Sequence, residues 1–114
     1  MRYSANARFV AALFCLTLAP QFAHAQDIEA GREIATKWCG NCHNVSAAGG
    51  PASDRTPSFL SISQMSSTTQ MSLAVFLQTS HNRMPDFSLT RREIADVSSY
   101  ILDLKRQRQL LPAH

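Results

Sequence analysis

The chain has 114 residues, a length that indicates one small domain. Its formal net charge of +3 is too low for a typical nucleic-acid-binding protein. No stripe of lysine and arginine interleaved with aromatic residues is present either, so nucleic acid is excluded as the expected partner.

The first 25 residues have the pattern of a secretory signal peptide. Arg2 and Arg8 give a positive start, residues 9–19 form an uncharged and largely apolar run, and Ala23 and Ala25 provide small residues two apart. A retained membrane anchor is the alternative, but the run is shorter than the about 20 residues that span a bilayer. We therefore expect a signal peptide over 1–25, a domain over 26–114 and export to the periplasm.

The first helix of this domain is expected to begin near Asp27, a residue type favoured at helix N-termini. Ile34 and Trp38 are four residues apart, and so are Gly31 and Ala35. Two adjoining stripes at this spacing are typical of a helix that packs along one broad side.

A loop and two short elements follow. Residues 44–56 are rich in Ser, Ala, Gly and Pro and predict an irregular loop, and 57–60 predict a short helical turn. The Ser and Thr residues at 66–69 offer several N-caps for a second helix. That helix should end near Ser80, because Pro85 disfavours helix just before it.

The last helix has the clearest start. Thr90 and Glu93 fit the capping box, in which the two residues satisfy each other's backbone N–H groups. Apolar residues then recur at three- and four-residue steps: Ile94, Val97, Ile101 and Leu104. No segment alternates with period two for long enough to predict a strand. The predicted fold is all-α, with three main helices and one short helical turn.

Residues 39–43, Cys-Gly-Asn-Cys-His, form the C-x-x-C-H motif of covalent haem attachment. Residues three apart on a helix share a side, so Cys39 and Cys42 can each add to one vinyl group of the same porphyrin. His43 then lies beneath the ring, where it can bind the iron. We expect one covalently bound haem c.

The cysteine pair has three other interpretations. A zinc site would need another ligand, and His81 and His114 are the histidines left in the domain. A redox dithiol usually lies in a fold that contains strands, which this sequence does not predict. A disulfide between Cys39 and Cys42 would leave His43 without a role.

The domain resembles the small bacterial class I cytochromes c over nearly its whole length. The resemblance rests on GREIATKWCGNCH at 31–43, TPSF at 56–59, HNRMPDF at 81–87 and a final amphipathic helix that contains Tyr100. It implies the cytochrome c fold around one haem.

The resemblance also implies the remaining ligand of the iron. The family presents its methionine ligand at the position of Met84, and His/Met ligation raises the reduction potential. His81 is the rival ligand. In the family a proline carbonyl accepts a hydrogen bond from the axial histidine, a role for which we expect Pro57, with Pro51 as the alternative.

Two packing expectations complete the prediction, and the first of them follows from the same resemblance. Gly31 and Tyr100 should form the contact between the first and last helices. A set of apolar side chains is expected to line the haem pocket: Trp38, Phe59, Leu60, Leu73, Phe76, Leu77, Phe87 and Val97.

The expected function is one-electron transfer by a periplasmic protein that is not itself an enzyme. Its partners would be a redox donor and a redox acceptor, with membrane contact only through membrane-bound partners. Two alternatives remain: a haem subunit of a periplasmic oxidoreductase, and a ligand-binding or catalytic haem protein with an open iron position. The chain would be a monomer or a subunit of such an oxidoreductase.

Overall fold

The computed structural model describes residues 26–50, 56–79 and 84–110. The order of its helical elements is α2 (Ile28–Ile34), η2 (Ala35–Cys39), α3 (Phe59–Gln64), α4 (Gln70–Gln78) and α5 (Arg91–Leu110). Within these ranges Thr56 and Met84 are single β-bridge residues, and there is no β-strand of two or more residues. The predicted all-α fold is confirmed.

The helix α2 begins where the sequence predicts. The Asp27 carboxylate accepts hydrogen bonds from the backbone N–H groups of Glu29 and Ala30, each at 3.0 Å. The helix continues without a break into the wider π-helical turn η2, in which the Gly40 N–H donates to the Ala35 carbonyl at 3.0 Å. This turn ends at Cys39, the first residue of the attachment motif.

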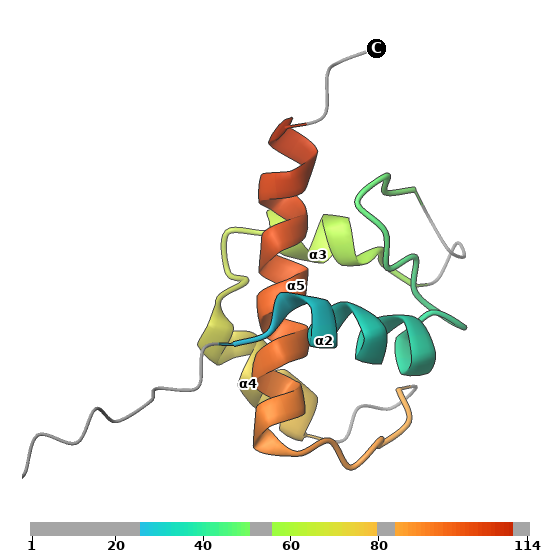
Figure 1. Cartoon of the computed structure of the whole chain (residues 1–114), viewed down its shortest axis with the longest axis vertical. Helices are drawn as coiled ribbons and strands as arrows, with labels where there is room; N and C mark the ends of the chain where they lie inside the picture. The colour runs from blue at the N-terminus through green and yellow to red at the C-terminus, as the bar shows by residue number, and fades with distance from the viewer. Residues whose placement is uncertain (1–25, 51–55, 80–83, 111–114) are drawn as a thin grey trace, which may run out of the picture.

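The long helix α5 is central, and α2, α3 and α4 each pack against it (Figure 1). Its predicted capping box is confirmed: the Thr90 N–H donates to Glu93 Oε2 at 2.7 Å, and the Glu93 N–H donates to Thr90 Oγ1 at 3.2 Å. The apolar stripe predicted for this helix is buried.

Hydroxyl side chains cap the two shorter helices. Ser58 Oγ accepts from the Ser61 N–H at 3.1 Å at the start of α3, which extends to Gln64 and is longer than the predicted turn. Thr69 and Ser72 cap α4 reciprocally. The helix α4 ends at Gln78, two residues before the predicted end.

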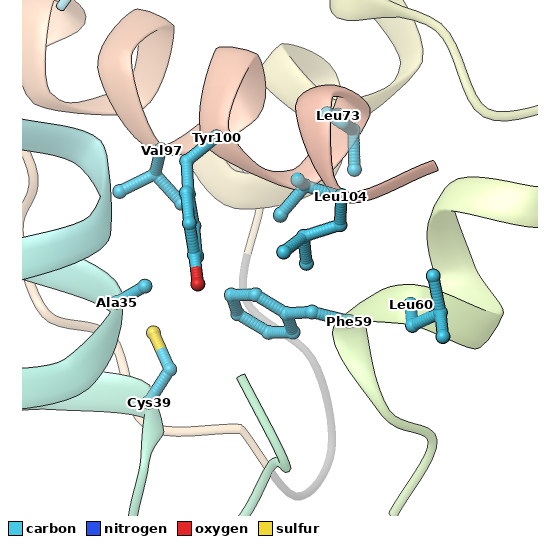
Figure 2. Close-up of a cluster of buried hydrophobic side chains, with 9 residues drawn as sticks. Ala35, Cys39, Phe59, Leu60, Leu73, Val97, Tyr100 and Leu104 are labelled. Atoms are coloured by element: carbon cyan, nitrogen blue, oxygen red, sulfur yellow. The ribbon is translucent and has the colours of Figure 1, made fainter. Parts of the chain in front are cut away.

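The core lies between α5 and the elements packed on it (Figure 2). Its buried members are Ala35, Cys39, Phe59, Leu60, Leu73, Val97, Tyr100, Ile101 and Leu104. In Figure 2 the rings of Tyr100 from α5 and Phe59 from α3 point toward the Cys39 side of the cluster. The first cysteine of the motif is therefore part of the packed interior.

The contact predicted between Gly31 and Tyr100 is confirmed, and it is closer than a ring contact alone. A Cβ atom at position 31 would lie 2.1 Å from the backbone oxygen of Asp96 and 3.0 Å from Tyr100 Cβ. The backbones of α2 and α5 approach each other so closely that no side chain fits at this crossing.

The predicted signal peptide, residues 1–25, lies outside the described residues, and so do Pro51, His81 and His114. The proposed boundary after Ala25 therefore stays a prediction. In the part of the chain that is described, no helix combines the length and apolarity needed to cross a bilayer.

Candidate haem-binding site

The backbone of the attachment motif continues the helical path of η2. The N–H groups of Cys42 and His43 both donate to the Cys39 carbonyl, at 3.1 and 2.9 Å. Cys39 is 5% exposed, whereas Cys42 is exposed, and the two thiols are not joined in a disulfide. Burial, with a smaller contribution from Cys42, raises the pKa of the Cys39 thiol.

The imidazole of His43 is oriented by a backbone carbonyl. His43 Nδ1 lies 2.7 Å from the Pro57 oxygen, 14 residues away along the chain. Because a carbonyl oxygen can only accept, Nδ1 carries the proton in this contact, and Nε2 keeps the lone pair that a metal ion requires. The ring also packs against Phe59, with centroids 5.2 Å apart.

Further hydrogen bonds join the segment that follows His43 to the start of α3 and hold a turn within that segment. The Phe59 N–H donates to the Asn44 carbonyl at 2.9 Å, which pairs the residue after His43 with the first residue of α3. The Asn44 side chain donates to the Gly49 carbonyl at 2.7 Å and accepts from the Ser46 N–H at 3.0 Å. Sequence reasoning missed this role of Asn44, although Asn in a Ser- and Gly-rich loop is a signal for such a turn.

Tyr100 provides a second contact that the sequence did not reveal. Its hydroxyl donates to the Val45 carbonyl at 2.6 Å, from α5 to the segment that follows His43. Burial is the largest influence on this hydroxyl and raises the pKa of Tyr100.

Met84 is half-buried at the start of the segment that leads to α5. It lines a pocket together with the C-terminal end of α4 and its own neighbours: Phe76, Leu77, Gln78, Thr79, Pro85, Asp86, Phe87 and Leu89. Phe87 also contacts Trp38, with ring centroids 5.7 Å apart, and so joins this segment to η2.

The predicted pocket residues divide into two groups. Phe59, Leu60, Leu73 and Val97 are buried in the core, and Leu77 packs against it. Trp38 and Phe76 are 44% and 47% exposed and lie outside the core, so their place in the haem pocket stays a prediction. Leu73 and Leu77 are one turn apart on the core side of α4, which leaves Phe76 on its flank.

The chemistry of these donors fits haem c. Two thiols three residues apart on a helical turn, an imidazole with Nε2 available and a thioether supply attachment and iron ligation. A zinc site is less suited, because the described segments hold no group of three or more His, Cys, Asp or Glu side chains able to bind a metal ion.

Comparisons with known proteins agree with this chemistry. Residues 26–101 match the family described as Cytochrome C oxidase, cbb3-type, subunit III. The chain is also 37% identical over 95 residues to Cytochrome c-552 of Bradyrhizobium diazoefficiens, an alignment that covers 80% of this chain and 91% of that protein. No solved structure matches significantly. The chain belongs to the small class I cytochromes c, which are electron-transfer proteins with covalently bound haem c.

Proposed function

We propose that this protein is an exported single-haem electron carrier in which His43 and Met84 bind the iron. The haem, when bound, supplies the one-electron redox change. The observation that carries the proposal is the 2.7 Å contact between His43 Nδ1 and the Pro57 carbonyl, because it fixes the tautomer and the ring orientation that an axial ligand needs.

Each residue of the site has a distinct task in this proposal. Cys39 and Cys42 hold the porphyrin by thioether bonds, so the cofactor stays with the protein through each transfer. The Pro57 carbonyl orients the His43 imidazole by the hydrogen bond that it accepts from Nδ1. The Met84 thioether raises the reduction potential, because a soft ligand favours ferrous iron. The apolar core beside Cys39 acts in the same direction, since it disfavours the extra charge of the ferric centre.

The test of Met84 is its replacement by alanine in the haem-loaded protein. Met84→Ala should leave the haem attached, lower the reduction potential sharply and allow rapid binding of carbon monoxide by the reduced protein. Met71→Leu is the matched control, because Met71 is 77% exposed on α4 and should affect none of these readings. An unchanged potential and spectrum in Met84→Ala would remove Met84 from the site.

His81→Ala separates the two candidate ligands. Under the proposal this variant keeps the potential and the spectrum of the wild type. A loss of the native spectrum in His81→Ala, together with its retention in Met84→Ala, would instead support ligation by His81.

Export to the periplasm rests on the sequence of residues 1–25. When the full chain is produced in a host that attaches haem after export, the mature protein should begin at Gln26. Mass spectrometry of the purified protein should give the polypeptide from Gln26 with one added haem. A haem protein that retains residues 1–25 would contradict the proposed cleavage.

A role as the haem subunit of an oxidoreductase is the second candidate. It is favoured by the match over residues 26–101 to a family described as an oxidase subunit. Purification of the native protein under mild conditions discriminates between the two. A free carrier elutes at its own mass, whereas a subunit remains with a larger protein.

A further inference from the structure

Trp38 lies next to Cys39 in η2, yet the two side chains have different surroundings. Cys39 is 5% exposed and belongs to the core, whereas Trp38 is 44% exposed and lies outside it. Core packing therefore does not account for a large aromatic residue at this position. The Trp38 ring contacts Phe87, at 5.7 Å between centroids, and the Lys37 ammonium, 4.9 Å from the ring centroid.

Phe87 comes three residues after Met84, in a segment whose backbone has little freedom. Pro85 has a fixed φ. The Ser88 N–H donates to Asp86 Oδ1 at 2.8 Å, and Ser88 has a φ of 50°. Along the chain only Pro85 and Asp86 separate Phe87 from Met84.

The same segment is anchored on a second side by α4. Phe76 and Leu77 of α4 line one pocket with Met84, Pro85 and Phe87. The contact between Trp38 and Phe87 is thus one link between the Met84 segment and the helix of the attachment motif. The link joins the two parts of the chain that would bind opposite faces of the haem.

We propose that Trp38 and Phe87 form a positioning pair that keeps the Met84 thioether in place as the sixth ligand. This inference rests on the proposed ligation by Met84. Tilted aromatic pairs of this kind contribute enough to shift an equilibrium by about 2- to 12-fold. Removal of the pair should raise, by that factor, the rate at which Met84 is exchanged for an external ligand.

The experiment uses the oxidised haem-loaded protein mixed with imidazole. At saturating imidazole the rate of ligand exchange reports how fast Met84 leaves the iron. Trp38→Ala and Phe87→Ala should each raise this rate about 2- to 12-fold. The double variant should be no faster than the faster single variant, because each substitution removes the same contact. Trp38→Phe should keep a rate close to that of the wild type.

Two controls isolate the pair from other effects. Val75→Ala changes a residue that is 58% exposed on α4 and should leave the rate unchanged. Lys37→Ala removes the cation beside Trp38 and should also have little effect. A pair that only stabilised the fold would lower the melting temperature of Trp38→Ala without raising the saturating rate, which would overturn the proposal.

Failure of this inference can be told apart from failure of the proposed function. If Met84→Ala binds imidazole no faster than the wild type and keeps its spectrum, Met84 is not the ligand and the proposed function fails. If Met84→Ala opens the iron but Trp38→Ala and Phe87→Ala keep the wild-type rate, the positioning pair alone is refuted. Phe87→Leu serves in place of Phe87→Ala if the latter does not fold, with the same expected increase in rate.

Discussion

The Tyr100 hydroxyl donates a hydrogen bond of 2.6 Å to the carbonyl of Val45, which lies 55 positions earlier in the chain. Val45 is two residues after His43, so the bond ties the last helix to the segment that leaves the attachment motif. The Tyr100 ring itself is 4% exposed and packs in the core. One residue therefore connects the packing of α5 with the position of the histidine.

Tyr100→Phe should lower the free energy of unfolding by about 1 kcal/mol, because it removes this bond and leaves the Val45 carbonyl without its donor. The pKa of Tyr100 is raised above its ordinary value of 10.0, so the fold favours the neutral hydroxyl. The stability that this pKa difference contributes is fully present below pH 10.0. It is lost as the pH rises from there through the higher pKa that Tyr100 has in the folded protein. Denaturant unfolding above and below pH 10.0 should thus show a weaker alkaline loss in Tyr100→Phe than in the wild type.

Gly31→Ala should destabilise the protein by about 1–3 kcal/mol or more, because the new Cβ would lie 2.1 Å from the Asp96 oxygen and force α2 and α5 apart. Gly50→Ala is the comparison: its Cβ would meet no atom closer than 3.9 Å, but its φ of +88° is costly for alanine. That variant should lose about 1 kcal/mol. Thermal unfolding should show a larger loss of stability for Gly31→Ala than for Gly50→Ala. Equal losses would contradict the close approach of α2 and α5 at Gly31.

Ser98→Ala should stabilise the protein. Ser98 is fully buried, and its hydroxyl has no hydrogen-bond partner among the described residues. Replacement of an unpaired buried hydroxyl by a methyl group removes a desolvation cost of about 1 kcal/mol, which corresponds to a rise of about 4–8 °C in melting temperature for a domain of this size.

The neighbouring residue provides the control for this prediction. Ser99 Oγ is within hydrogen-bond distance of Gln26 Oε1, at 2.8 Å, and of the Ala95 carbonyl, at 2.9 Å. Ser99→Ala should therefore have no stabilising effect. A fall in melting temperature for Ser98→Ala would mean that its hydroxyl has a partner after all.

Glu93→Gln should reduce the loss of folding stability at acid pH. Hydrogen bonds from the Thr90 backbone N–H and hydroxyl lower the pKa of Glu93 below its ordinary value of 4.5. The stability that the ionised Glu93 contributes is present above pH 4.5. It is lost as the pH falls from there through the lower pKa that Glu93 has in the folded protein. Glutamine can still accept from Thr90 but does not titrate there, so the loss of stability below pH 4.5 should be smaller in the variant. Thr90→Ser keeps the same donors and should retain the wild-type pH dependence.

The starts of α2, α4 and α5 could be predicted because the groups that set them are close in sequence. Asp27 caps α2 within three residues, Thr90 and Glu93 cap α5 reciprocally, and Thr69 caps α4 with Ser72. The C-x-x-C-H motif could be recognised for the same reason, since its chemistry is contained in five consecutive residues.

Contacts between distant segments could not be predicted in the same way. Asp96 accepts a hydrogen bond of 2.8 Å from the Asp27 N–H, across 69 positions, and no local pattern marks either residue for this pairing. The contact of Trp38 with Phe87 could not be predicted, because the four-residue spacing of Trp38 from Ile34 is equally compatible with the core side of a helix and with its flank.

The sequence by itself determined the helical fold, the helix starts and the C-x-x-C-H motif, because these depend on short-range hydrogen bonding and on the spacing of side chains along one helix. The Pro57 carbonyl that meets His43 was expected from the family resemblance, whereas only the tertiary structure decided which ring contacts Trp38 and which carbonyl accepts from Tyr100. Those contacts depend on how α5 brings separate loops together, and the energy of such packing is shared among residues that are far apart in the chain.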